Sequence, residues 1–141
     1  MIKQIIIPFV VIFILFIIID VPVIVWLNTL MYQKQFKRIN KSDINIGIHT
    51  WISATIAYLL LTLGLYLFIV RPELTNFKPE YLTIFFKGLS LGLIIYGVYN
   101  GTNKATINEW GTVESLIDTT WGTLLSGLLS ISSVYITKKF I

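Results

Sequence analysis

The sequence contains no cysteine among its 141 residues and only one histidine. Without cysteine, disulfides, thiolate metal sites and a cysteine nucleophile are excluded. One histidine excludes a histidine-rich metal site. The chain also lacks a phosphate-binding glycine loop and any recognisable catalytic motif. We therefore expect no metal and no cofactor. Whether the protein is an enzyme stays open, although the lack of a catalytic motif favours a protein that is not an enzyme.

Charged residues are scarce as well. They make up 13% of the chain, whereas a soluble domain usually has about 25%. Hydrophobic residues make up 55%, and the mean hydropathy is +0.79. Such a chain cannot cover its surface in water, so its main expected partner is a lipid bilayer. The net charge of +4 does not indicate nucleic acid, because the basic residues flank apolar segments, where they meet lipid headgroups.

Long apolar stretches are what the sequence has instead. In lipid, an uninterrupted run of about 20 apolar residues must be a helix, because a helix satisfies all backbone hydrogen bonds within one segment. We expect an all-α, integral membrane four-helix bundle in one domain, residues 1–141, with spans at about residues 5–27, 46–70, 82–99 and 116–137.

Four spans place both termini on one membrane face, here called face A, and the first span ends at the opposite face, face B. The basic residues divide equally between the two faces, so the positive-inside rule does not fix the orientation. The protein is expected to be a multi-pass integral membrane protein, and which membrane holds it stays open.

Polar side chains gather in the half of the membrane next to face B. Asp20 lies roughly 12 Å inside the face-B surface, at about 1.5 Å of helix rise per residue. An aspartate at such depth costs about 2.5–3.5 kcal/mol, so we expect it to be paired or used. The candidate polar pocket consists of Asp20, His49, Tyr96, Tyr99, Asn100, Thr102, Asn103, Asp118 and Trp121.

Several of these residues also have ordinary explanations. Tryptophans at span ends usually form an interfacial belt. A histidine at a helix start, such as His49, is more often an interfacial residue than a ligand. Asp118 fits a solvated acid at the positive end of a helix. Pro22 frees the carbonyl of Ile18 and predicts a kink beside Asp20.

Two rows of residues four apart predict close packing of the third and fourth spans, because small side chains let membrane helices approach. The rows are Gly88, Gly92, Tyr96 and Asn100 on the third span, and Asp118, Gly122, Ser126 and Ser130 on the fourth. Packing of these rows is expected to turn Asp118, Asn100 and His49 toward Asp20.

The stretch "YNGTNKAT", residues 99–106, is interpreted as one lip of this pocket. Gly101 is expected to let the chain turn sharply where the third span ends. Thr102 and Asn103 are then expected to fold back over Asp118. A solvated surface loop is the alternative.

The segments "YGVYNGTNKATINEW" and "IDTTWGT" resemble the signature of the Domain of Unknown Function 2177 family of small membrane proteins. That signature has Thr-Asn-x-Ala-Thr, a tryptophan and then Asp-x-x-Trp-Gly-Thr. Asn100 departs from it, since an aspartate is typical there, and so does Val23, where a tryptophan is typical. The resemblance implies a four-helix integral membrane protein and no established reaction, substrate or cofactor.

Three classes of function remain open. The polar pocket binds a lipid or a small amphiphile, or the protein is a small ion, proton or solute transporter, or it is a structural or assembly subunit whose acids pair with a partner helix. A homo-oligomer is compatible with all three. We favour a multi-pass membrane protein of unknown biochemical activity with a polar pocket in the face-B half, closest to the first class, in which Asp20, Asp118 and His49 serve as polar contacts or proton donors.

Overall fold

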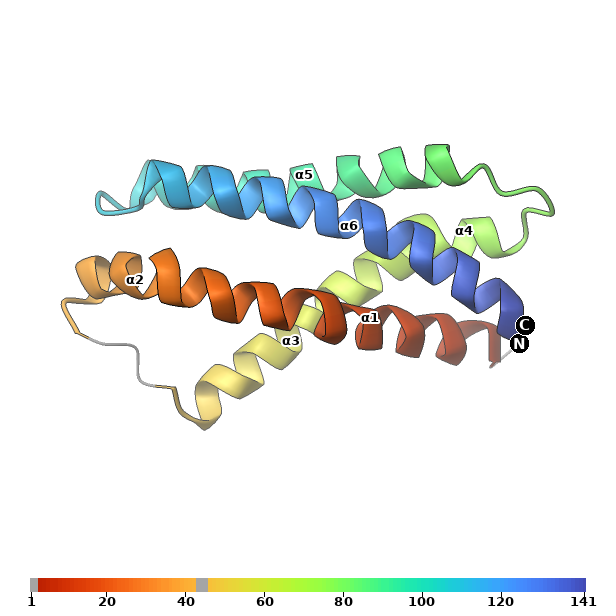
Figure 1. Ribbon diagram of the computed structural model, residues 1–141, viewed down its shortest axis with the longest axis horizontal. Coiled ribbons are helices and arrows are strands. Elements are labelled where there is room, and N and C mark those ends of the chain that lie inside the picture. The colour runs from red at the N-terminus through yellow and green to blue at the C-terminus, as the bar shows by residue number, and fades with distance from the viewer. Residues whose placement is uncertain (1–2, 43–45) are drawn as a thin grey trace.

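The computed structural model describes residues 3–42 and 46–141, and these residues form long helices with short connections (Figure 1). Two of the long helices contain a short π-helical segment. The elements in chain order are α1 (Lys3–Leu27), η1 (Asn28–Tyr32), α2 (Gln33–Asn40), α3 (Ile48–Leu65), η2 (Tyr66–Val70), α4 (Arg71–Leu74), α5 (Tyr81–Thr106) and α6 (Thr112–Phe140). The described part contains no strand. The predicted all-α bundle of four long helices is confirmed.

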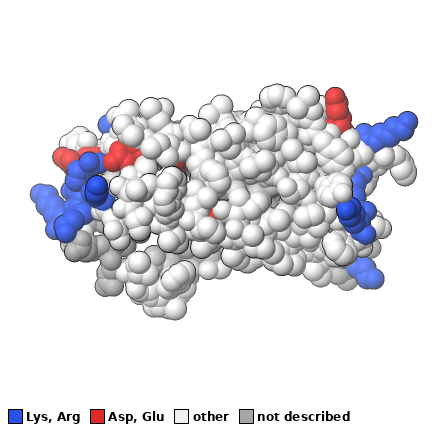
Figure 2. All heavy atoms as spheres, viewed as in Figure 1, with Lys and Arg blue, Asp and Glu red and all other residues white. Residues whose placement is uncertain are grey.

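Three of the long helices have the length and apolar content to cross a membrane: Lys3–Asn40, Ile48–Leu74 and Tyr81–Thr106. Figure 2 shows that charged side chains gather at the two ends of the molecule and leave the middle of this face almost uncharged. Large apolar residues are exposed along the helices, as expected where the solvent is lipid. These are the features of a multi-pass membrane protein.

The fourth expected span corresponds to α6, which is long enough with 29 residues. Its serines and threonines give it a lower apolar content, and it is not among the three helices that reach the apolar content of a span. Its polar residues face the bundle, since Ser126, Ser130 and Ser133 are buried. The fourth span therefore stays a prediction.

Two helices extend beyond the expected span ends. The first continues from Leu27 to Asn40, because lysine, arginine and glutamine favour helix, and it ends where Lys41 adopts a left-handed conformation with φ of 55°. The third continues to Thr106. The expected turn at Gly101 is wrong: a single glycine costs a helix only about 1 kcal/mol relative to alanine, too little to end it.

α5 and α6 pack in close contact along the two predicted rows. A Cβ atom on Gly88 would lie 2.4 Å from Ser130 Oγ, and one on Gly92 would lie 2.7 Å from the Gly122 carbonyl oxygen. Both distances are too short for real atoms, so only glycine fits. The close packing predicted from the small residues is confirmed, and it brings Asn100 and Asp118 to the same end of the helix pair.

The apolar core lies toward the middle and the face-A half of the bundle. Its buried residues are Ile12, Phe16, Leu65, Tyr66, Ile69, Val70, Ile84, Leu125, Leu129 and Val134. α3 packs against α1, but its first turns diverge from the other helices at the face-B end (Figure 1). The start of α1 and the end of α6 lie together at the face-A end (Figure 1).

This arrangement predicts two groups of accessible positions in the membrane. Single cysteines at Lys3, Lys78 and Lys139 should react with a membrane-impermeant maleimide from one side, and cysteines at Lys34 and Asn108 from the other. All five residues are exposed, so access depends only on the side of the membrane. Labelling of Lys3 and Lys139 from opposite sides would show that α6 does not span the membrane.

Candidate functional site

Asp20 is the deepest acid of the face-B half, and only 4% of it is exposed. The Tyr58 hydroxyl donates a hydrogen bond to one carboxylate oxygen at 2.7 Å, and the Trp121 indole N–H donates to the other at 2.7 Å. Asp20 thereby joins α1 to α3 and α6. The expectation that this aspartate faces the bundle and is paired is confirmed.

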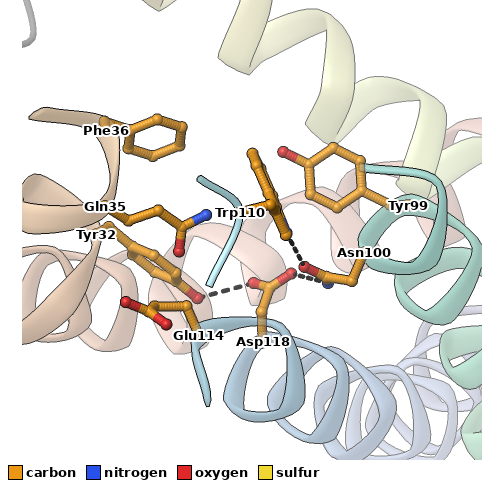
Figure 3. Close-up of a pocket in the computed structure, with 8 residues that line it drawn as sticks. All are labelled: Tyr32, Gln35, Phe36, Tyr99, Asn100, Trp110, Glu114 and Asp118. Carbon is orange, nitrogen blue, oxygen red and sulfur yellow. Dashed lines mark hydrogen bonds between the residues drawn. The ribbon is translucent and has the colours of Figure 1, made fainter. Parts of the chain in front are cut away.

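Asp118 is the centre of a second network nearer to face B (Figure 3). The Tyr32 hydroxyl donates to its Oδ1 at 2.8 Å, and the Asn100 amide donates to its Oδ2 at 2.6 Å. The Trp110 indole N–H in turn donates to the Asn100 amide oxygen at 3.3 Å. The network therefore ties the first helix, α5, the α5–α6 connection and α6 together.

The two networks meet along α6, where Asp118 and Trp121 are one turn apart. The ring of Tyr96 lies against Gly122, at a site where a Cβ atom would come within 2.3 Å of the ring. The salt bridges found in the described part of the chain involve neither Asp20 nor Asp118.

The π-helical segment Asn28–Tyr32 gives Tyr32 its position. Twelve residues make about 3.3 turns of an ideal α-helix, so Tyr32 would lie about a third of a turn away from the face of Asp20. The segment closes with a bond from the Gln33 N–H to the Asn28 carbonyl and accommodates one extra residue. That residue rotates Tyr32 and the following helix, including Gln35, toward α6.

A cavity of about 170 Å³ lies beside Asp118, and here it is called the polar cavity. It is lined by Tyr32, Gln35, Phe36, Tyr99, Asn100, Trp110, Glu114 and Asp118 (Figure 3). The ring centroid of Trp110 lies 6.2 Å from that of Phe36 and 5.8 Å from that of Tyr99, both edge to face. Glu114 forms a 2.8 Å ion pair with Arg38 at the surface.

An apolar groove of about 370 Å³ reaches Asp118 from the side, between α3 and α5, and here it is called the lateral groove. It is lined by Ala57, Leu60, Leu61, Ile95, Tyr96, Tyr99 and Asp118. Leu60 is 63% exposed at its rim. Because α3 diverges at this end, the groove opens toward the lipid. Asp118 and Tyr99 line both the groove and the polar cavity.

The structure brings most of the predicted pocket residues together: Asp20, Tyr96, Tyr99, Asn100, Asp118 and Trp121 lie in or beside the two networks. Asn103 is half-buried and interacts with the Tyr99 side chain instead of folding over Asp118. The contact with Asp118 expected of Asn103 is made by Asn100, three residues earlier and nearly one helical turn away.

Two predicted placements are wrong. His49 is exposed in the first turn of α3, which diverges from the other helices, and so it does not turn toward Asp20. Thr102 is exposed, and its hydroxyl donates to carbonyls of its own helix, at Val98 and Tyr99. Thr102 stays in the helix because the chain does not turn at Gly101.

Some tryptophans lie in an interfacial belt and others lie in the polar site, the two roles that the sequence left open. Trp26 and Trp51 are 60% and 66% exposed, as in an interfacial belt. Trp110 is buried and Trp121 binds Asp20.

Sequence reasoning missed Tyr32, Gln35 and Tyr58. A signal existed for Tyr58, because a tyrosine hydroxyl within an apolar span requires a hydrogen-bond acceptor. Tyr32 and Gln35 carry no such signal, since they lie in a polar stretch that reads as solvated. Among the described residues, no group of three histidine, aspartate or glutamate side chains is arranged to hold a metal ion.

A family model described as a predicted membrane protein, DUF2177, matches residues 5–135 of the chain. No curated protein and no solved structure matches the chain.

Proposed function

Since the chain belongs to the DUF2177 family of predicted membrane proteins, we propose that it binds a lipid or a small amphiphile in the face-B half of its helix bundle. The polar part of the ligand occupies the polar cavity, and the apolar part lies in the lateral groove. In this proposal α6 is the fourth span, so that both sites lie within the bilayer.

One observation carries the proposal: Asp118 lines both the polar cavity and the apolar groove. Ligand sites in proteins are concave and mostly apolar, with a few polar groups that fix the orientation of the ligand. Here the polar groups lie at the inner end of a groove whose walls are Ala57, Leu60, Leu61 and Ile95. A molecule with one polar end and one apolar end matches this arrangement.

Retention of lipid by the purified protein tests the proposal. Ala57→Trp places a large ring in the lateral groove. We expect it to lower the lipid retained per protein about tenfold, which corresponds to about 1.4 kcal/mol of binding free energy. The measurement is native mass spectrometry of the protein extracted in a mild detergent.

Ile56→Trp is the matched control. Ile56 is 52% exposed on the neighbouring face of α3 and does not line the groove. The control should retain lipid like the wild type. Equal lipid content in the wild type and both variants would contradict binding in the groove.

Proton or ion transport is the second candidate, and two acids in the same half of the bundle favour it. Acids inside a membrane often mark ion or proton pathways. Neither Asp20 nor Asp118 takes part in the salt bridges found among the described residues. A proton flux into proteoliposomes that Asp20→Asn abolishes would favour transport over simple ligand binding.

A further inference from the structure

We infer that the polar cavity receives a protonated amine with N–H donors, that is, a primary or secondary ammonium group. The inference deepens the proposed function, because it names the chemistry of the polar end of the ligand. Three features of the cavity carry it: its charge, an unpaired buried acceptor and its aromatic wall.

The charge of the cavity suits a cation. Asp118 and Glu114 are its charged lining residues, and none of the lining residues is basic. Arg38 forms an ion pair with Glu114 at the surface. Among the described residues, Asp118 accepts hydrogen bonds only from Tyr32 and Asn100, which are both neutral. Asp118 therefore lies at the cavity without a salt-bridge partner among the described residues, and its carboxylate is available to a cation.

Gln35 supplies the second feature, because its side chain lines the cavity and its amide oxygen accepts no hydrogen bond from the described residues. The residue is 2% exposed, and its Oε1 atom has no hydrogen-bond partner among the described residues. The amide projects from the first helix into the space between Tyr32 and Trp110 (Figure 3). A buried carbonyl oxygen without a donor is unfavourable. A ligand with an N–H group satisfies it, and a quaternary ammonium cannot.

Aromatic rings form the third feature. Phe36, Tyr99 and Trp110 meet edge to face on the wall opposite the carboxylates. Ring faces attract cations within about 6 Å, and most strongly where water is excluded. The volume of about 170 Å³ exceeds the roughly 30 Å³ of one water molecule several times over. An aminoethyl group therefore fits between the rings and the acceptors.

Competition between lipids of equal acyl chains tests the inference. The purified protein is incubated with equimolar phosphatidylethanolamine, phosphatidylcholine and phosphatidylglycerol, and the bound lipids are counted by native mass spectrometry. We expect phosphatidylethanolamine to be retained about tenfold over the other two. Gln35→Met, which removes the acceptor and keeps the volume, should reduce that preference to near equality, and so should Asp118→Asn.

The matched control is Glu80→Gln at the face-A end, where the carboxylate accepts a bond from Thr83. It should leave the preference unchanged. Thermal unfolding of every variant shows whether it is folded. If Gln35→Met does not fold, Asp118→Asn, which should also reduce the preference, carries the test. Gln35→Glu keeps an acceptor and should keep the preference for phosphatidylethanolamine, and a loss of the preference in this variant would contradict the role of the acceptor.

Free ethylammonium distinguishes a lipid headgroup from a soluble amine. A change in tryptophan fluorescence on adding ethylammonium chloride without lipid, lost in Asp118→Asn, supports the amine site with a soluble source. Preference for phosphatidylethanolamine without that response supports a lipid source. A preference for phosphatidylglycerol, an unchanged preference in Gln35→Met, or equal retention of the three lipids together with no fluorescence response to ethylammonium overturns the inference.

The failures of the two proposals differ. Retained lipid that Ala57→Trp removes, with neither a headgroup preference nor a fluorescence response to ethylammonium, overturns the amine alone. If no lipid of any kind is retained, the lateral groove is not a lipid site. The fluorescence response to ethylammonium then tests the amine site alone, and the absence of a response overturns the inference.

Discussion

Asp20→Leu is expected to lower the free energy of unfolding by about 2 kcal/mol, because it leaves two half-buried donors without an acceptor. The Tyr58 hydroxyl and the Trp121 indole N–H both bind this carboxylate at 2.7 Å. Each unpaired group costs about 1–3 kcal/mol in a protein interior, and interhelical hydrogen bonds in membranes lie at or below the lower end of that range. Three helices lose their shared polar contact.

Asp20→Asn is the matched variant, since it keeps the shape of the side chain and one oxygen acceptor. Its loss should stay within about 1 kcal/mol, the typical contribution of one hydrogen bond. The measurement is equilibrium unfolding in mixed micelles. Combining Asp20→Leu with Tyr58→Phe should cost less than the sum of the two single changes by about 0.5 kcal/mol or more. Equal stability of the wild type, Asn and Leu forms would show that the network does not support the bundle.

Gly92→Leu is expected to cost about 3 kcal/mol, at the upper end of the penalty for overpacking. Even the first atom of the new side chain would lie 2.7 Å from the Gly122 carbonyl oxygen and from Ser126 Cβ. One of these is backbone and cannot rotate away, so α5 and α6 must separate. Separation would also lengthen the 2.6 Å bond between Asn100 and Asp118, two turns further along α5.

Gly97→Leu is the control for the same helix. No atom lies within 4 Å of a Cβ atom built at Gly97. Leucine there should be neutral or should stabilise α5 by up to about 0.8 kcal/mol, through helix propensity alone. The ratio of folded to unfolded protein in mixed micelles compares the two variants. A Gly97→Leu loss as large as that of Gly92→Leu would mean that the effect does not come from the contact with α6.

The membrane class, the all-α fold and the position of the polar residues along the helix axes followed from the sequence. Few charges and long apolar runs leave a chain no alternative to helices in lipid. The rows through Gly92 and Ser126 determined which faces of α5 and α6 meet. Because those rows end in Asn100 and Asp118, the contact between these two side chains could be predicted from the sequence.

Other features depended on rotation and tilt, which hydropathy does not specify. The π-helical segment after Leu27 rotates Tyr32 and Gln35 into the site, although their stretch reads as a polar loop. The tilt of α3 removes His49 from the pocket and opens the lateral groove, while Tyr58 of the same helix still reaches Asp20. A helix in lipid is apolar on almost every side, so its rotation and tilt are set by contacts with its neighbours, and only the tertiary structure contains these contacts.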